Sequence, residues 1–486
     1  MDYVFIASEA HPYIDTGSLG KFVYFFIKGI SKRMNSTILI LPFYKKIKNM
    51  SAEFNIKEAG FDIVVNMMGI EIKASIYKAD CENYVVYFID NDEYFYREYL
   101  YSVGNKEYVD NAERFIFFNQ AALNLLIKLE CKPDLIHTID WQTGLIPVYL
   151  KTIYKNFFPN TTSIHTIYNP IYQGVFSQFD MPLTNLPWDL FTPDKLEFYG
   201  KLNFLKGGII FSDAIVVPSE KFVDEVIMPD FGFGLHDVYK IYKYKLKGIS
   251  IGYDNEEWNP DRDISIKATF SAESVENRVE CKKHLLRKFD LIEDNRPLIG
   301  IINRLTKDEG IDFIIENSDE LLKRNVNLIF IGEGDVEYEN KILDIKSKFN
   351  RNFVFLNRFN QQEIKDFFAG IDILVKPSLV EPGGLSQLYA MRYGALPLAS
   401  NIGGLKDTII NIFDNFEHGN GFHFNPGNKE DFFFKLDKVI GYYYNNIDDW
   451  KRWQKNAILN KHTFDKTIEE YCKLFEILTG KKGCKK

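Results

Sequence analysis

Cysteine is scarce in this chain, and its placement excludes two ways of holding a small fold together. Among 486 residues there are five cysteines, which are odd in number and far apart: Cys81, Cys131, Cys281, Cys472 and Cys484. None belongs to a C-x-x-C pair, so the pattern fits neither a disulfide framework nor a zinc site. A reducing compartment is the simplest account, and the sequence therefore predicts a cytoplasmic protein without a metal.

Long apolar runs and an excess of basic charge are also missing. Hydrophobic residues make up 46% of the chain, yet no run approaches the roughly 20 apolar residues that a membrane-spanning helix needs. The first residues, MDYVFIASEA, have neither the basic n-region nor the long apolar core of a signal peptide. With 59 basic and 67 acidic residues, the net charge of −8 argues against nucleic acid or a membrane surface as partner.

Short apolar segments alternate with amphipathic helical segments along the chain, a pattern typical of α/β proteins with helices covering parallel sheets. The chain exceeds what one hydrophobic core usually organises. We expect two doubly wound, Rossmann-like domains facing a cleft, with ligand at the carboxyl ends of the strands. The predicted strands are residues 4–7, 37–41, 135–137, 164–167, 214–217, 298–302, 327–331, 353–355, 373–375 and 396–399. The predicted domains are residues 1–247 and 248–460, followed by a helix and basic tail at 461–486.

Residues 376–407, KPSLVEPGGLSQLYAMRYGALPLASNIGGLKD, are the most informative segment. Glu381 opens a turn that contains Gly383 and Gly384, where backbone amides can approach a phosphate or sugar closely before a helix that begins near Leu385. A second glycine turn, Gly403-Gly404, precedes another helix. An ordinary connection between strand and helix also uses glycine, and that alternative stays open at this point.

This segment resembles the nucleotide-sugar signature of retaining glycosyltransferases, most closely that of bacterial glycogen synthases and plant starch synthases. Further segments are similar to the family in the same order, from residue 3 to about residue 425: VFIASEAHPYIDTGSLGKF, HTIDWQTGLIPVYLK, IYNPIYQGVF, LPWDLFTP, FYGKLNFLKGGIIFSD, PDFGFGL, GYDNEEWNP, INRLTKDEGIDFI and IGEGDVEYE. The resemblance implies the GT-B fold, with the last helix crossing back onto the N-terminal domain. It also implies transfer of glucose from ADP-glucose to the non-reducing end of an α-1,4-glucan, with retention and without a cofactor.

The resemblance assigns roles to individual residues. Arg304 would bind the diphosphate and Glu381 would be catalytic, although a surface ion pair and a helix-capping acid are the alternatives for these two. The residues expected to bind the nucleotide sugar are Gly17, Ser18, Lys21, Lys307, Tyr338, Gly383, Gly384, Leu385, Gly403 and Gly404. For Tyr338 a packing role is the alternative. Those expected at the acceptor or transferred sugar are Asp140, Tyr168, Asn169, Lys201 and Asn203.

Several positions depart from the family pattern. Asp15 and Lys21 exchange the lysine and aspartate of the family's first glycine loop, and Tyr168 stands in place of its histidine. Glu309, five residues after Arg304, replaces a lysine, and a carboxylate there is expected to repel phosphates. Lys21 or Lys307 would then compensate. The alternative is a catalytically impaired or inactive paralogue that binds glucan or regulates a partner synthase, and a third option is a related enzyme with another donor or acceptor.

Overall fold

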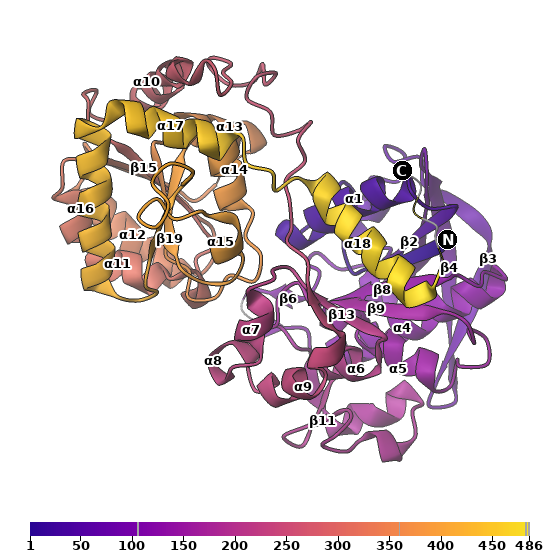
Figure 1. Cartoon of the computed structure of the whole chain (residues 1–486). Coiled ribbons are helices and arrows are strands. Elements are labelled where there is room, and N and C mark those ends of the chain that lie inside the picture. The colour runs from indigo at the N-terminus through magenta and orange to yellow at the C-terminus, as the bar shows by residue number, and fades with distance from the viewer. Residues whose placement is uncertain (105, 359, 482–483, 485–486) are drawn as a thin grey trace. The chain divides into compact units, whose positions relative to one another are not determined.

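A computed structural model describes residues 1–104, 106–358, 360–481 and 484 (Figure 1). The chain forms two compact units. Unit 1 consists of Met1–Pro218, Val223–Ile249 and Thr467–Lys486, and unit 2 of Ser219–Phe222 and Ser250–Lys466. The division after Ile249 lies close to the sequence-based boundary at residue 247. Most of the predicted basic tail, residues 482–483 and 485–486, lies outside the described residues.

Unit 1 is built on one large sheet. Its strands, in spatial order, are β14 (Leu246–Gly248), β13 (Ala214–Val217), β9 (Thr162–Thr166), β8 (Leu135–Ile139), β1 (Asp2–Ile6), β2 (Ser36–Pro42), β5 (Val85–Asp90), β4 (Ile70–Asp80) and β3 (Lys57–Met67). The strands from β14 to β5 are parallel. Every residue of β8 is buried, as expected for a strand covered on both faces.

The far edge of this sheet adds antiparallel strands to the expected parallel sheet. β3 and β4 form an antiparallel hairpin, and β4 also pairs antiparallel with β5. The hairpin turn is Met68-Gly69, with φ angles of 53° and 82°, which suits a two-residue turn. Towards its end β3 alternates buried and exposed residues, so one face of the hairpin is solvated. A smaller antiparallel sheet comprises β10 (Val175–Ser177), β12 (Lys201–Asn203) and β11 (Glu197–Phe198), and another β6 (Ser102–Val103) and β7 (Lys106–Glu107).

The helices of unit 1 include the last one of the chain. They are α1 (Ser18–Ser31), α2 (Lys45–Asn49), α3 (Asp92–Phe95), α4 (Asn111–Lys128), α5 (Leu145–Lys151), α6 (Phe204–Phe211), α7 (Phe222–Val226), α8 (Pro229–Gly232), α9 (His236–Ile241) and α18 (Phe464–Thr479). Figure 1 shows α18, in yellow, beside α1, in indigo. The Tyr471 ring of α18 lies 4.7 Å from that of Phe26, and Phe475 stacks on Tyr3 at 5.5 Å. A Cβ on Gly29 would lie 2.8 Å from Ile468 Cγ1. The C-terminal helix is therefore part of the core of unit 1.

Unit 2 contains one sheet whose strands are all parallel. Its strands, in spatial order, are β17 (Phe353–Leu356), β16 (Asn327–Ile331), β15 (Leu298–Ile302), β18 (Ile373–Lys376), β19 (Leu396–Ser400) and β20 (Phe422–Phe424). Its helices are α10 (Arg278–Lys288), α11 (Ile311–Leu322), α12 (Val336–Lys348), α13 (Gln361–Gly370), α14 (Ser386–Arg392), α15 (Gly403–Thr408), α16 (Lys429–Asn445) and α17 (Ile447–Ile458). Because all strands point the same way, the loops after β15, β18 and β19 lie at one edge of the sheet.

All five cysteines are free thiols, two of them buried. Among the helices described, none is both long enough and apolar enough to cross a membrane.

Candidate functional site

Three loops of unit 2 meet where neighbouring strands end. Gly310, in the loop after β15, has a φ of 74° and packs so closely on the loop after β18 that a Cβ would lie 2.1 Å from the Pro377 carbonyl oxygen. The Gly404 amide, after β19, donates a hydrogen bond of 3.0 Å to the Glu381 carbonyl oxygen. A Cβ on Gly404 would lie 1.7 Å from Gly383 O. The two predicted glycine turns are therefore in direct backbone contact, and only glycine fits between them.

Buried charges fill the space beneath these loops. Lys376, the last residue of β18, places its ammonium 2.6 Å from Glu309 Oε2 and 3.0 Å from Glu381 Oε2. It also donates a hydrogen bond of 2.9 Å to Asn303 Oδ1. The Lys376 side chain is 6% exposed and the two carboxylates 12% and 13%. The Glu381 carboxylate accepts a further hydrogen bond of 3.2 Å from Ser378 Oγ.

The mutual arrangement of these groups sets their protonation. Burial alone would lower the pKa of Lys376, but the carboxylates of Glu309 and Glu381 raise it above its ordinary value. Burial opposes ionisation of Glu309 as well, yet Lys376 and Arg304 hold its pKa below the usual range. Burial raises the pKa of Glu381, which Lys376 partly offsets and Glu309 reinforces. Lys376 and Glu309 are thus a charged pair at neutral pH.

Arg304 lies at the exposed end of the same cluster. Its guanidinium is 3.2 Å from Asp308 Oδ2 and 3.3 Å from Glu309 Oε1, and 47% of its side chain is exposed. It forms the surface ion pairs named above as its alternative role, and it still presents guanidinium surface at the strand end where the resemblance places a diphosphate. Lys307 is exposed in the 3₁₀ turn Lys307–Glu309.

The helix-capping alternative for Glu381 is wrong. Leu385 is the N-cap of α14, and its side chain makes no capping hydrogen bond. The Glu381 carboxylate instead bonds to Lys376 and Ser378. Gly384, with a φ of 73°, allows the turn between Glu381 and α14, and Gly403 opens α15.

Tyr338 belongs to the first turns of α12, which follows β16. The loop before α12 is joined to the Arg304 loop by a bridge between Leu305 and Gly334. Burial, and then its contact with Asp312, raise the pKa of the Tyr338 hydroxyl. The ring is half-buried, and Lys341 lies 5.6 Å from its centre.

In unit 1, the predicted acceptor residues gather at the ends of β8 and β9. Asp140, with a φ of 53°, directly follows β8. Its Oδ1 accepts hydrogen bonds from the backbone amides of Tyr168, at 2.7 Å, and Asn169, at 3.2 Å. Burial raises the pKa of Asp140 to about 7, although both amide hydrogen bonds oppose this shift. Asp140 therefore fixes the loop that carries Tyr168 and Asn169.

The first glycine loop of unit 1 lies beside this loop. The Tyr168 ring is 5.4 Å from that of Phe22 in α1. Gly17 is the N-cap of α1, Ser18 is its first residue, and Lys21 is half-buried in its first turn. Asp15 Oδ2 lies 2.8 Å from His11 Nδ1. Gly17, Ser18, Lys21 and Tyr168 are therefore grouped on unit 1, and Arg304, Lys307 and Glu381 on unit 2.

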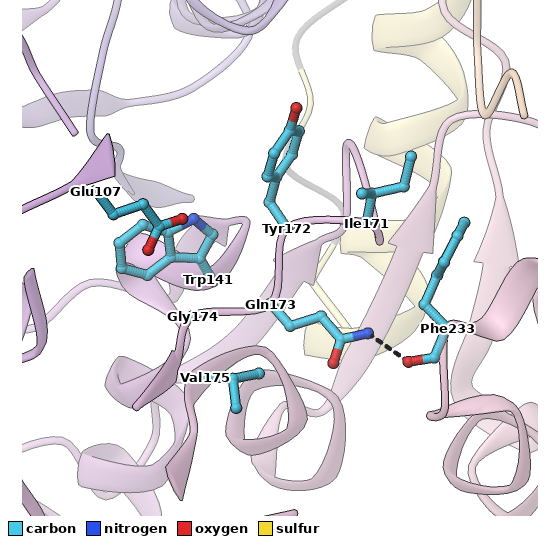
Figure 2. A pocket seen from close by; sticks show the side chains of 8 residues that line it. All are labelled: Glu107, Trp141, Ile171, Tyr172, Gln173, Gly174, Val175 and Phe233. Carbon is cyan, nitrogen blue, oxygen red and sulfur yellow. Dashed lines mark hydrogen bonds between the residues drawn. The ribbon is translucent and has the colours of Figure 1, made fainter. Parts of the chain in front are cut away.

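A pocket of about 310 Å³ opens in unit 1 next to Asn169 (Figure 2). Its lining residues are Glu107, Trp141, Ile171, Tyr172, Gln173, Gly174, Val175 and Phe233. The Gln173 amide donates a hydrogen bond of 2.9 Å to the Phe233 carbonyl oxygen, which Figure 2 shows dashed. Gly174 packs on the indole, because a Cβ there would lie 2.5 Å from Trp141 Cε3. Aromatic faces and amide groups together suit a sugar.

Two residues expected at the sugar have other positions. Asn203 is completely buried. Its Oδ1 caps α6 by accepting a hydrogen bond from the Lys206 amide, and its Nδ2 donates to Gln173 Oε1 at 2.9 Å. A direct sugar contact is therefore a poor assignment for Asn203, which instead orients the pocket residue Gln173. Lys201 is exposed at the start of β12.

Sequence reasoning missed Lys376 and the pocket residues. A lysine that ends a buried apolar strand was an available signal, because a buried cation needs an anionic partner and Glu309 is a carboxylate where the family has a lysine. The pocket was harder to predict, since Trp141 and Tyr172 are separated in sequence and Phe233 is more distant still. Among the described residues there is no group of three or more histidine, cysteine or acidic side chains suited to a metal ion.

Comparisons with known proteins extend along the whole chain. A family model described as the starch synthase catalytic domain matches residues 3–241, and one described as glycosyl transferases group 1 matches residues 282–458. The glycogen synthase of Hydrogenobaculum sp. is 34% identical over 483 residues, which cover 98% of each chain. That of Finegoldia magna is 34% identical over 479 residues, covering 98% of this chain and 99% of the relative.

Two solved structures are similar to the whole chain. The catalytic domain of starch synthase IV from Arabidopsis thaliana, bound to ADP and acarbose, superposes with a TM-score of 0.89 at 27% identity over 99% of both chains. Sucrose-phosphate synthase from Thermosynechococcus elongatus gives a TM-score of 0.60 at 13% identity, covering 99% of this chain and 100% of the other. The second likeness concerns the fold alone.

Proposed function

Because this chain belongs to the glycogen synthase family, we propose that it transfers glucose from ADP-glucose to the non-reducing end of an α-1,4-glucan with retention of configuration. Its two-domain α/β fold is of the predicted GT-B class. The observation that carries the proposal is the meeting of Arg304, Glu381 and the two glycine turns at the carboxyl ends of β15, β18 and β19.

The donor end of this proposal depends on charge. As the glycosidic bond to the diphosphate breaks, negative charge grows on the phosphate oxygens and must be met by preorganised donors. The Arg304 guanidinium is placed to meet it, and the glycine turns let backbone amides approach closely. ADP in the related starch synthase structure supports an adenine nucleotide as donor. No cofactor is part of the proposal, and transfer is expected to persist in the presence of a chelator.

Glu381 serves the sugar end of the donor. The departing glucosyl unit acquires positive charge near its anomeric carbon, which a carboxylate stabilises. The Glu381 carboxylate is held from two sides by Lys376 and Ser378, so it is oriented before substrate arrives. Such preorganisation lets a charged group act without a cost of rearrangement in the transition state.

The pocket of unit 1 is the proposed acceptor site. The related starch synthase binds acarbose, a ligand reported together with ADP. Here Trp141, Tyr172 and Phe233 offer apolar faces, and Glu107 and Gln173 offer polar atoms for sugar hydroxyls. Tyr172 is 46% exposed, and Figure 2 shows its ring projecting from the loop. We assign Tyr172 to contact the glucan directly.

The inactive alternative is based on Asp15, Tyr168 and Glu309, of which Glu309 is expected to repel phosphates. In the folded chain that carboxylate is bound between Lys376 and Arg304 and is largely covered. Its repulsion is therefore compensated locally. Asp15 Oδ2 lies 2.8 Å from His11 Nδ1, and that histidine offsets the charge of Asp15 only when it is protonated.

The test is incorporation of labelled glucose from ADP-glucose, and in parallel from UDP-glucose, into glycogen by the purified protein. Glu381→Gln should lower turnover by about 10² or more, the usual loss of one preorganised electrostatic group. Glu293→Gln is the matched control, because Glu293 forms an ion pair with Arg287 at the surface of the same unit. Transfer that survives Glu381→Gln unchanged contradicts the assignment of Glu381. Glycogen binding without any transfer contradicts the proposed activity and supports the inactive paralogue.

A further inference from the structure

The four charged side chains of Arg304, Glu309, Lys376 and Glu381 form one connected cluster, called here the Lys376 network. Lys376 is its centre. The ammonium has three N–H donors, and the structure gives it three acceptors, Glu309 Oε2, Glu381 Oε2 and Asn303 Oδ1, at 2.6–3.0 Å. Its donors are therefore used within the protein, so Lys376 acts on substrate through its neighbours.

Glu309 links the ammonium to the guanidinium. Its Oε2 faces Lys376, and its Oε1 accepts from both Nε and Nη2 of Arg304 at 3.3 Å. The network thus holds two positive and two negative groups, and Asp308, 3.2 Å from the Arg304 guanidinium, adds a further negative group at its exposed end. The network connects the proposed diphosphate arginine with the proposed catalytic carboxylate. Removing one member leaves an uncompensated charge on the others, which are mostly buried.

The two central positions belong to different loops that touch. Glu309 follows β15 and Lys376 ends β18, while Gly310 packs on the Pro377 carbonyl oxygen directly after Lys376. The resemblance places a lysine at 309, where this chain has glutamate. This chain therefore lacks the cation that the family has at position 309, but the Lys376 ammonium lies 2.6 Å from the Glu309 carboxylate.

We propose that Lys376 is the positioning residue of the donor site: it neutralises Glu309 and holds the Glu381 carboxylate, so that Arg304 can receive a nucleoside diphosphate. The inference rests on the proposed function for the identity of the ligand. The ion pair between Glu309 and Lys376 takes the place of a single lysine at 309, with the cation moved to the neighbouring strand.

The two members of the pair should have opposite effects on nucleotide binding. Lys376→Met makes the network more negative by one charge, and ADP affinity should fall about tenfold or more. Glu309→Gln keeps the side-chain shape but makes the network more positive by one charge, and ADP affinity should rise several-fold to about tenfold. The double variant restores the net charge of the parent protein and should bind ADP within about threefold of it. If Lys376 served only the stability of the fold, Glu309→Gln would not raise ADP affinity.

Lys282, in α10, supplies a matched control near the other end of β18. Lys282 is buried and pairs with Asp372 at 2.6 Å, immediately before β18 begins, whereas Lys376 ends that strand. Lys282→Met therefore removes a comparable buried ion pair from the opposite end of β18. It should lower the melting temperature about as much as Lys376→Met, by about 10 °C, and leave ADP affinity within about twofold.

The experiment measures ADP binding by calorimetry, melting temperature, and kcat and KM for glucose transfer, on the full chain and these variants. Support is the opposite change of ADP affinity in the two single variants, with recovery in the double variant. Lys376→Met should also lower kcat by about 10², because Glu381 loses its support, and Lys376→Arg should restore part of it. The inference is overturned if Glu309→Gln weakens ADP binding, if the single effects add in the double variant, or if Lys282→Met weakens ADP binding as much as Lys376→Met.

Failure of the proposed function gives a different result. If the parent protein neither binds ADP nor transfers glucose, the melting temperatures alone decide: a double variant more stable than Lys376→Met supports the coupled pair, and an additive loss contradicts it. If Lys376→Met does not fold, folding of the double variant is itself the non-additive result. If neither Lys376→Met nor the double variant folds, and the parent protein binds ADP, the ADP affinity of Glu309→Gln decides: a rise supports the proposal and a fall overturns it.

Discussion

Replacing Asp140 by asparagine should stabilise the protein at alkaline pH and impair its activity. Asp140 is 6% exposed, directly after β8, and its Oδ1 accepts the amides of Tyr168 and Asn169. Asparagine has an oxygen in the same place and can accept both hydrogen bonds. It carries no charge, so it avoids the cost of ionising a buried carboxyl.

The sign and size of this effect follow from the pKa. Burial raises the pKa of Asp140 from 3.8 to about 7 in the folded protein. Between these values the folded state holds a proton that the unfolded state has released, so the contribution of Asp140 to stability falls as pH rises and levels off above about 7. The full cost is about 4 kcal/mol, equivalent to about 10 °C in the melting temperature of a domain this large.

The assay is the free energy of unfolding in urea for both proteins from about pH 4 to pH 8. The difference between Asp140→Asn and the parent should grow across this range in favour of the variant. Asp134→Asn is the control with opposite sign, because Lys481 and the Asp2 amide hold the pKa of Asp134 low despite some burial. That variant should be less stable than the parent by a nearly constant amount over this range, because the stabilisation by an ionised Asp134 is lost only below about pH 4. Glucose transfer by Asp140→Asn should fall, because a neutral amide oxygen accepts the hydrogen bonds from the Tyr168 and Asn169 amides less strongly than a carboxylate and holds the acceptor loop less firmly.

One outcome would refute the reasoning. If the stability difference between Asp140→Asn and the parent does not change from about pH 5 to pH 8, the carboxyl is not held protonated by its surroundings. A constant loss at all pH values would mean that the added amide hydrogens of asparagine, and not the charge, dominate at this position.

Two further predictions concern packing. Gly404→Ala should destabilise the protein by about 3 kcal/mol in urea unfolding and lower glucose transfer, because its Cβ would meet Gly383 O at 1.7 Å. The control is Gly441→Ala in α16, where no atom lies within 4 Å of the new Cβ. That variant should instead stabilise the protein by up to about 1 kcal/mol. Phe475→Ala should cost about 3–5 kcal/mol, because Phe475 is fully buried against Tyr3. Ile477→Ala, at a 79% exposed position of the same helix, should change unfolding little, and equal losses would contradict the docking of α18.

The strands at the centres of both sheets were predictable because they are buried on both faces. Residues 214–217, 298–302 and 327–331 were predicted with the bounds that the structure shows for β13, β15 and β16. The hairpin of β3 and β4 was missed. Its sequences, KEAGFDIVVNM and IEIKASIYKAD, mix charged and apolar residues, because one face is in water, and a search for continuous apolar runs passes over them.

The site residues divide in the same way. The sequence by itself determined the family, the two glycine turns, and the assignments of Glu381 and Arg304, because those depend on residue type and order along the chain. Only the tertiary structure decided what surrounds them. It placed Lys376 between Glu309 and Glu381, and it turned Asn203 inward as a helix cap. Whether a charge repels a substrate depends on which opposite charge lies within a few ångströms, and that distance is set by how parallel strands bring together residues far apart in sequence.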